Sequence, residues 1–363
     1  MPLHQLTGHR QARSRLSRAL RGGKLPQVLL LTGPTGVGKQ RLALWLAQLA
    51  FCEQRGEEPC GSCRPCRLVA GLSHSDLHWF VPIPRPKASD PDKQVEEAAQ
   101  AIAQVLDERR ADPLYQPADG MATHSLASVR LLQRRAGLTS VEGGPRVFII
   151  GEADRLIAQE ASQEAANALL KLLEEPPAGS LFMLTTVEAR RLLPTMRSRA
   201  VPVRLGRLSD AEVSEFLKAH LRPALASREL EQRVARAVGS IGLALGAGSD
   251  SGKAQQAAQQ WLEAVLTGAG PSFERALKQP SWAARGEFTA MLDALSETLG
   301  QAARGTLGQP VRGPVPKALL RHRQPDPLLR AMEHVADARE AAWGNVNPQI
   351  LLAVLGEELA EVL

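Results

Sequence analysis

The sequence predicts an α/β domain with a parallel sheet covered by helices, followed by helical domains. Three observations lead to this prediction. A glycine-rich loop follows an apolar run and opens a helical stretch, which is the strand–loop–helix context of a phosphate-binding loop in a P-loop NTPase fold. Buried-strand patterns then alternate with helical patterns up to about residue 205, as is typical of a parallel sheet. From about Leu208 the strand signal disappears.

The composition sets the scale of the protein and excludes some classes. A chain of 363 residues is long enough for about two or three domains, and 44% hydrophobic residues suffice for buried cores. The net charge of +6 comes mostly from scattered arginines, so we expect a solvated surface that permits contact with nucleic acid. No stretch approaches a membrane span and the N-terminus lacks an apolar signal region, so we expect a cytoplasmic protein without membrane contact.

The first α/β unit begins with an arginine-rich helix, expected over residues 9–20 and ended by Gly22-Gly23. The apolar run Val28–Leu31 predicts the first strand, and residues 41–47 predict the helix that follows the glycine-rich loop. A short strand is expected over residues 77–81, where prolines follow it.

Residues 83–125 are polar and predict an insertion in the α/β scaffold. One helix is expected within it, over residues 95–109, and residues 115–123 are expected to be irregular because they contain Pro, Gly and Asp. The sequence assigns this insertion no role.

The scaffold resumes with a helix near residues 126–135 and a buried strand over residues 146–150. A long helix is expected over residues 158–173, and it stops before Pro176-Pro177. A further buried strand follows over residues 181–186. Strands and helices at this spacing predict a parallel sheet with helices on both faces.

The rest of the chain is predicted to be helical. Short amphipathic helices are expected over residues 209–248, and the Gly/Ser stretch 246–252 is expected to be a hinge. Residues from about 253 to the end are helical by pattern, with a Pro/Gly-rich loop near residues 308–316.

The glycine-rich loop reads GPTGVGK over residues 33–39, and the next residue is the unusual one. Backbone amides and the ammonium of Lys39 can hold a phosphate. A working loop then places Ser or Thr, whose hydroxyl holds magnesium, whereas Gln40 offers a longer carboxamide. The candidate nucleotide-binding residues are Gly33, Thr35, Gly36, Val37, Gly38, Lys39 and Gln40.

All four cysteines lie within fifteen residues, at positions 52, 60, 63 and 66. Closely spaced thiolates in a reducing compartment are good tetrahedral zinc ligands. Four thiolates would fill the coordination shell, so Cys52, Cys60, Cys63 and Cys66 predict a structural Zn2+ rather than a catalytic one. Unrelated free cysteines are the alternative.

Five stretches in this order resemble one family. They are the phosphate loop, the cysteine cluster, residues 167–177 with the run Leu-Glu-Glu-Pro-Pro, Leu184-Thr185-Thr186, and Arg197-Ser198-Arg199. This combination resembles bacterial DNA polymerase III clamp-loader subunits of the AAA+ class. The resemblance covers most of residues 5–205, and beyond them only the helical character and Gly239-Ser240 support it.

The resemblance implies three domains. We expect an AAA+ nucleotide-fold domain over residues 1–206, with the zinc module at 52–66 and the insertion at 83–125. A small helical lid domain is expected over residues 207–250, and an all-α C-terminal collar domain for oligomerisation over residues 251–363.

Two kinds of subunit share this pattern, the ATP-hydrolysing gamma/tau type and the delta-prime type, and three positions favour the second. Gln40 replaces the magnesium-binding Ser or Thr, and Gly151 stands where an active member carries a magnesium-supporting Asp. Residues 239–242 read Gly-Ser-Ile-Gly, without the arginine that senses the γ-phosphate in the gamma type. Glu152 aligns with the water-activating Glu, but a base without a positioned metal has little to act on.

The resemblance also assigns a role to Arg199. In this family a Ser-Arg-Cys motif presents an arginine finger across the subunit interface to the neighbour's ATP, and this chain reads Ser198-Arg199-Ala200. Arg199 is therefore the expected catalytic residue in trans, and Arg197 is the second candidate. Thr185 and Thr186 lie where the family's sensor hydroxyl lies, and a structural hydrogen bond is the alternative role.

The resemblance implies a delta-prime-type subunit in a hetero-pentamer with gamma/tau and delta subunits, which loads a sliding clamp onto primer-template DNA. ATP or ADP could bind without hydrolysis, and the polymerase activity of the holoenzyme would belong to another chain. An active gamma/tau-type ATPase is the alternative. A zinc-dependent nucleic-acid reader is a third interpretation, but no aromatic residue lies between Arg64 and Arg67 to support base recognition.

Overall fold

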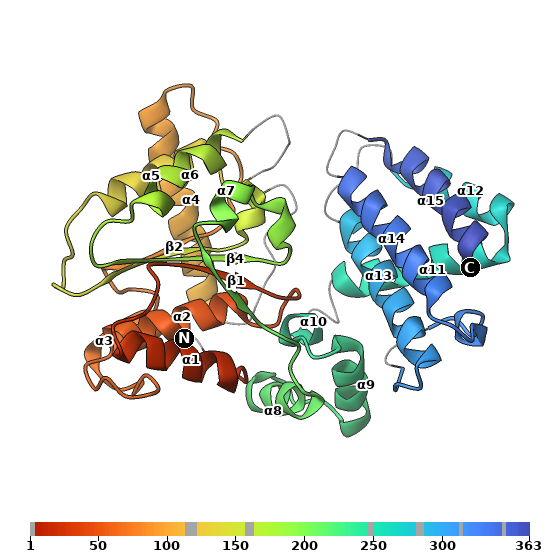
Figure 1. Cartoon of the computed structure of the whole chain (residues 1–363), viewed down its shortest axis with the longest axis horizontal. Coiled ribbons are helices and arrows are strands. Elements are labelled where there is room, and N and C mark those ends of the chain that lie inside the picture. Colours follow the sequence, from red (N-terminus) through yellow and green to blue (C-terminus); the bar gives the residue numbers. More distant parts are fainter. Residues whose placement is uncertain are drawn as a thin grey trace. The chain divides into compact units, whose positions relative to one another are not determined.

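The computed structural model describes residues 4–112, 122–156, 163–245, 250–280, 287–311, 315–342 and 346–363. The chain divides into two compact units (Figure 1). Unit 1 comprises residues 1–225 and 239–245, and unit 2 comprises residues 226–238 and 246–363. No helix in the described part of the chain is long and apolar enough to cross a membrane.

Unit 1 is built on a five-stranded sheet in the order β2-β3-β4-β1-β5, and every pairing is parallel. The parallel sheet and the strands expected near residues 28–31, 77–81, 146–150 and 181–186 are confirmed. The observed bounds are β1 Val28–Thr32, β2 Leu77–Phe80, β3 Arg146–Ile150, β4 Ser180–Thr186 and β5 Val201–Arg204.

Strand β5 is absent from the sequence-based expectation. It reads Val-Pro-Val-Arg and lies at the edge of the sheet, where three of its four residues are exposed. An edge strand tolerates proline and needs no continuous apolar run, so it carries little sequence signal. It is a strand because it pairs in parallel with β1, where Pro202 lies opposite Leu30.

Helices cover both faces of the sheet. The helices α1, α2 and α3 lie on one face, and α5 and α6 lie on the other (Figure 1). The bounds in unit 1 are α1 Arg10–Arg21, α2 Lys39–Phe51, α3 Arg64–Ala70, α4 Pro91–Ala111, α5 Leu126–Ala136, α6 Glu164–Glu174, α7 Pro194–Arg197, α8 Asp210–His220 and α10 Ile241–Leu245. Short 3-10 helices span Ala153–Leu156 and Ala189–Arg191. The start of the helix expected from residue 158 falls on residues 157–162, outside the described ones.

The insertion is closed at its base by an antiparallel bridge between Ile83 and Thr123. Its helix, α4, begins at Pro91, four residues before the expected start. Asp90 caps it by accepting hydrogen bonds from the N–H groups of Asp92 and Lys93, and proline is favoured in the first turn. Of the segment expected to be irregular, residues 115–123, the part up to residue 121 lies outside the described residues.

Unit 2 is all-helical where it is described. Its helices are α9 Ser227–Ala237, α11 Asp250–Thr267, α12 Ala269–Leu277, α13 Glu287–Thr306, α14 Asp326–Ala341 and α15 Pro348–Val362, with a 3-10 turn over Leu319–Arg321. Their apolar faces enclose one core that includes Trp261, Phe288 and Leu295.

The expected hinge over residues 246–252 needs a correction. Residues 250–252 form the first turn of α11, so that part of the prediction is wrong. Asp and Ser are favoured at helix starts, and this preference explains why a polar Gly/Ser stretch begins a helix here. Residues 246–249 lie outside the described part.

Candidate functional site

The glycine-rich loop lies between the end of β1 and the start of α2, as the sequence predicts. Gly36 and Gly38 adopt left-handed φ values of 70° and 102°. Among the described residues, none accepts a hydrogen bond from the backbone N–H groups of Thr35, Gly36, Val37 or Gly38. Successive N–H groups in such a turn form a concave anion site at the start of a helix.

Lys39 lies folded onto the same loop. Its Nζ donates hydrogen bonds of 2.7 Å to the carbonyl oxygens of Gly33 and of Pro34. Burial lowers the pKa of Lys39 to about 8, although the nearby carboxylates of Asp154 and Glu152 act to raise it. The ammonium therefore remains mostly protonated at neutral pH, and it can move from these carbonyls to a phosphate.

The carboxamide of Gln40 covers the end of β3. A Cβ added to Gly151 would lie 3.1 Å from the Cδ, Nε2 and Oε1 atoms of Gln40. The Oε1 atom accepts a hydrogen bond of 3.1 Å from Nη1 of Arg109. Magnesium requires an octahedral shell of oxygen ligands between these two positions, and here the carboxamide of Gln40 stands in that space with the guanidinium of Arg109 bonded to it. The residues present do not fit a magnesium ion.

The polar residues beyond β3 and β4 are engaged with one another. Thr185 accepts a hydrogen bond of 3.0 Å from the N–H of Glu152, and Thr186 donates one of 2.8 Å to Asp154. Glu152 also pairs with Arg155 at 2.8 Å. Both threonines thus make structural hydrogen bonds, and Thr186 holds Asp154 in place.

The segment Gly239–Gly242 packs directly on the loop. The hydroxyl of Ser240 donates to the carbonyl oxygen of Thr35 at 2.8 Å, and the N–H of Gly242 donates to that of Gly36 at 3.0 Å. A Cβ added to Gly36 would lie 2.5 Å from Oγ of Ser240 and 2.7 Å from Cα of Gly242. The backbones approach this closely because glycine stands at both positions.

This packing predicts that Gly36→Ala destabilises unit 1. The substitution combines a left-handed φ with a backbone clash, for which we expect a loss of about 3 kcal/mol or more in the free energy of unfolding. Gly143→Ala is a matched control, because Gly143 has a φ of 73° and nothing within 4 Å of the added Cβ. Strain alone there should cost about 1–2 kcal/mol. Equal losses in chemical denaturation would contradict the close packing of Gly239–Gly242 on the loop.

The four cysteines form a second site. Their sulfur atoms all lie within 4.8 Å of one another, and those of Cys60 and Cys66 are 3.9 Å apart. A tetrahedron of thiolates with Zn–S bonds near 2.3 Å has sulfur–sulfur edges of about 3.8 Å, so the cluster fits zinc. A hydrogen bond from the N–H of Cys63 is the largest cause that lowers the pKa of Cys60 to about 6, toward the thiolate that a metal needs. The nearby His74 stacks on Phe51.

Arg199 lies just beyond α7 and is about one-third exposed. Its Nη2 atom lies 2.6 Å from Oε1 of Glu174, and its Nη1 atom donates to the carbonyl oxygen of Thr195 at 2.8 Å. The structure thus brings the loop residues together and the cysteines together. Arg199 lies apart from both groups in its contacts, which are with Glu174 and Thr195. Arg109 is the site residue that the sequence did not indicate, because it belongs to no motif.

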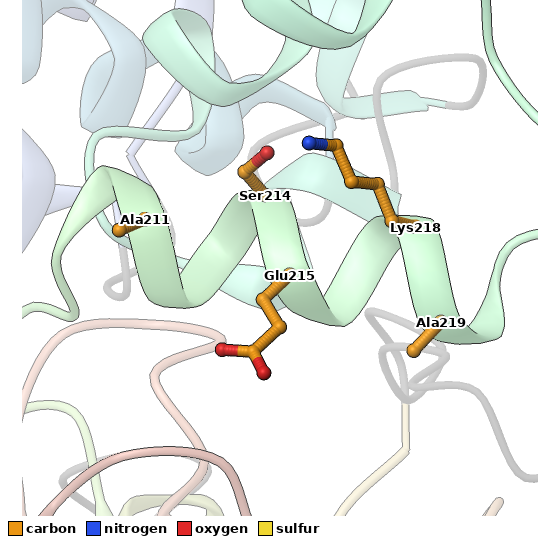
Figure 2. A pocket seen from close by; sticks show the side chains of 5 residues that line it. All are labelled: Ala211, Ser214, Glu215, Lys218 and Ala219. Carbon is orange, nitrogen blue, oxygen red and sulfur yellow. The ribbon is translucent and has the colours of Figure 1, made fainter.

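A surface depression of about 630 Å³ lies on α8, and none of the candidate site residues lines it. Figure 2 shows the five side chains that line it, all from this one helix, and they are Ala211, Ser214, Glu215, Lys218 and Ala219. A depression lined by one helix lacks the converging walls of a ligand site, so we assign it no function.

Comparison with known proteins identifies the family. Residues 8–209 match the family model described as DNA polymerase III, delta subunit. This match spans more than half of the chain. The chain belongs to this family.

The chain is similar to relatives of two kinds, delta' subunits and gamma/tau subunits. It is 29% identical over 228 residues to the DNA polymerase III subunit delta' of Bacillus subtilis, with 61% of this chain and 56% of the relative covered. It is 30% identical over 196 residues to the gamma/tau subunit of Mycobacterium tuberculosis, with 54% and 27% covered. The chain thus spans about half or less of these relatives' lengths.

Among solved structures, a gamma subunit-related protein of Thermotoga maritima aligns over 96% of this chain and 99% of its own, with a TM-score of 0.38 and 14% identity.

Proposed function

We propose that the chain is a delta-prime-type subunit of the DNA polymerase III clamp loader that does not hydrolyse ATP itself. The observation that carries the proposal is the carboxamide of Gln40 packed over Gly151, with Arg109 bonded to it. Hydrolysis by a phosphate-binding loop depends on magnesium held between the residues at positions 40 and 151. Neither position carries the usual magnesium ligand, and the carboxamide of Gln40 fills the space between them.

The same chemistry supports the delta-prime type over the gamma/tau type, a choice for which sequence identity gives no support either way. The delta' relatives are 28–34% identical to this chain and the gamma/tau relatives are 30% identical, so identity does not decide between them. A gamma/tau-type ATPase needs the hydroxyl and the carboxylate that Gln40 and Gly151 replace. It also needs an arginine at position 242, where glycine instead allows the backbone to pack on the loop.

In this proposal the chain contributes Arg199 to ATP held by a neighbouring subunit. A guanidinium stabilises the charge that develops on the transferred phosphoryl group. The ion pair between Arg199 and Glu174 lies at the surface, so the arginine can exchange this partner for an anion on another chain. The loop itself keeps its N–H groups and Lys39, which would hold ATP or ADP without hydrolysis.

The remaining parts of the proposal follow from the family. The chain would act in the cytoplasm in a hetero-pentamer with gamma/tau and delta subunits, and the assembly would load a sliding clamp onto primer-template DNA. The lid over residues 207–250 and the collar over residues 251–363 stay predictions. Zinc on the four cysteines would hold the turns of residues 52–66 together.

Turnover by the isolated chain tests the proposed lack of hydrolysis. We expect no magnesium-dependent ATP hydrolysis above background, and no change on Lys39→Ala. An active gamma/tau-type ATPase would instead turn over ATP, and Lys39→Ala would abolish that activity. The measurement is phosphate release at saturating ATP with and without magnesium.

A further inference from the structure

Arg109 connects the insertion to the phosphate-binding loop. It lies near the end of α4, and its guanidinium donates to Gln40, the residue directly after Lys39. The guanidinium also lies 4.3 Å from the centre of the Trp79 ring, in the strand β2. A hydrogen bond on one side and an aromatic face on the other fix the position of this cation.

Arg109 is bonded to the residue at which a metal ligand would be needed. Gln40 follows the loop at the magnesium-ligand position, and its carboxamide reaches over Gly151 at the end of β3. The guanidinium is bonded to the oxygen of this carboxamide, so its positive charge lies beside the space between Gln40 and Gly151. A guanidinium binds phosphate oxygens through two parallel N–H groups, and it needs no metal to do so.

We propose that Arg109 replaces the magnesium ion of this loop, so that the loop binds the polyphosphate of a nucleoside di- or triphosphate as a metal-free anion. The inference deepens the proposed function, because it rests on a loop that binds without hydrolysing. The donors are the N–H groups of Thr35–Gly38, the ammonium of Lys39 and the guanidinium of Arg109.

The surrounding charges fit an anion at this point. Arg41 lies near Arg109, and burial together with the charge of Arg109 lowers the pKa of Arg41 to about 10. The positive charge of Arg41 adds to the potential that attracts an anion to this part of the molecule. The carboxylates that act on Lys39, Glu152 and Asp154, are paired with Arg155 and Arg191 at 2.8 and 3.9 Å, so their negative charge is partly compensated.

Binding of ADP and ATP to the isolated full chain, in EDTA and in magnesium, tests the inference by calorimetry. We expect the affinity in EDTA to equal or exceed that in magnesium, because the site already holds its own cation. Arg109→Gln should weaken binding in EDTA by about 10-fold or more, the usual effect of losing a charge-assisted hydrogen bond. Arg109→Lys should retain only part of the binding, since it keeps the charge but lacks the two parallel N–H groups.

Arg134→Gln is the matched control for the loss of one positive charge. Arg134 lies on α5 and pairs with Asp92 on α4, on an exposed surface, and should leave nucleotide affinity unchanged. Thermal melting of each variant shows whether it is folded. Should Arg109→Gln fail to fold, the comparison of EDTA with magnesium in the unchanged chain still decides.

The double variant Gln40→Thr with Gly151→Asp gives the converse test. Removing the carboxamide frees the space over Gly151, and the two new oxygens restore magnesium ligands. Binding by this variant should become stronger in magnesium than in EDTA. Wild-type binding that requires magnesium, undetectable binding in EDTA, or full affinity in Arg109→Gln would each overturn the inference. None of these results touches the lack of hydrolysis, which the turnover test addresses separately.

Discussion

Replacing Arg199 by alanine is expected to abolish ATP hydrolysis at the neighbouring subunit while leaving this chain folded. An arginine supplied in trans is worth about 10³–10⁵ in rate where it has been measured for GTPases, so we expect a loss of at least ~10³-fold at that site. The fold should tolerate the change because Arg199 is one-third exposed and its partner Glu174 is 45% exposed. Such surface ion pairs contribute about 0–1 kcal/mol.

The measurement is DNA-stimulated ATP turnover by a clamp-loader assembly reconstituted with gamma/tau and delta subunits. Arg197→Ala is the informative comparison, because Arg197 is the second candidate and lies two residues away on α7. A loss with Arg197→Ala alone would transfer the role to that residue. Unchanged turnover with both variants would refute an arginine finger from this motif, and Arg134→Ala controls for the loss of charge.

Removal of zinc is expected to have the second largest effect, on stability. Structural zinc in zinc-finger peptides contributes about 10–16 kcal/mol of apparent binding free energy, which is coupled to local folding. Loss of one thiolate by Cys60→Ser should therefore release the metal and lower the melting temperature by roughly 10 °C. The purified chain should contain one zinc ion per molecule by metal analysis.

Ser62→Ala is the matched control for this substitution. The Ser62 hydroxyl lies 3.6 Å from the sulfur of Cys60 and contributes no ligand of its own, so this variant should keep its zinc. A wild-type chain that contains no metal, or a Cys60→Ser variant that retains zinc and full stability, would contradict the zinc site. A strong chelator should reproduce the effect of Cys60→Ser on the unchanged chain.

The parts of the structure predicted from the sequence are those encoded by short stretches. The strands β1, β3 and β4 are buried apolar runs, and such a run predicts a strand whatever its position in the sheet. The cysteines at 60, 63 and 66 are close in the chain, so tight turns alone bring their sulfurs near one another. The loop before α2 is likewise a local motif.

The parts that the sequence missed depend on residues far apart in the chain. Strand β5 has no apolar pattern, and it forms because β1 offers a free edge for pairing. The contact between Ser240 and Thr35 joins residues 205 positions apart, and that between Arg109 and Gln40 joins residues 69 positions apart. No pattern within a short window could indicate either pair.

The sequence by itself indicated the P-loop fold and the cysteine cluster, and it placed Gln40 and Gly151 where a working phosphate-binding site has magnesium ligands. Only the tertiary structure decided what lies between these two residues, namely the Gln40 carboxamide bonded to a guanidinium from α4. The physical reason is that the residue type at a ligand position can be read from the sequence alone. The bond from Arg109 to Gln40 is a contact between elements, and such contacts exist only once α4, β2 and β3 have packed beside the loop.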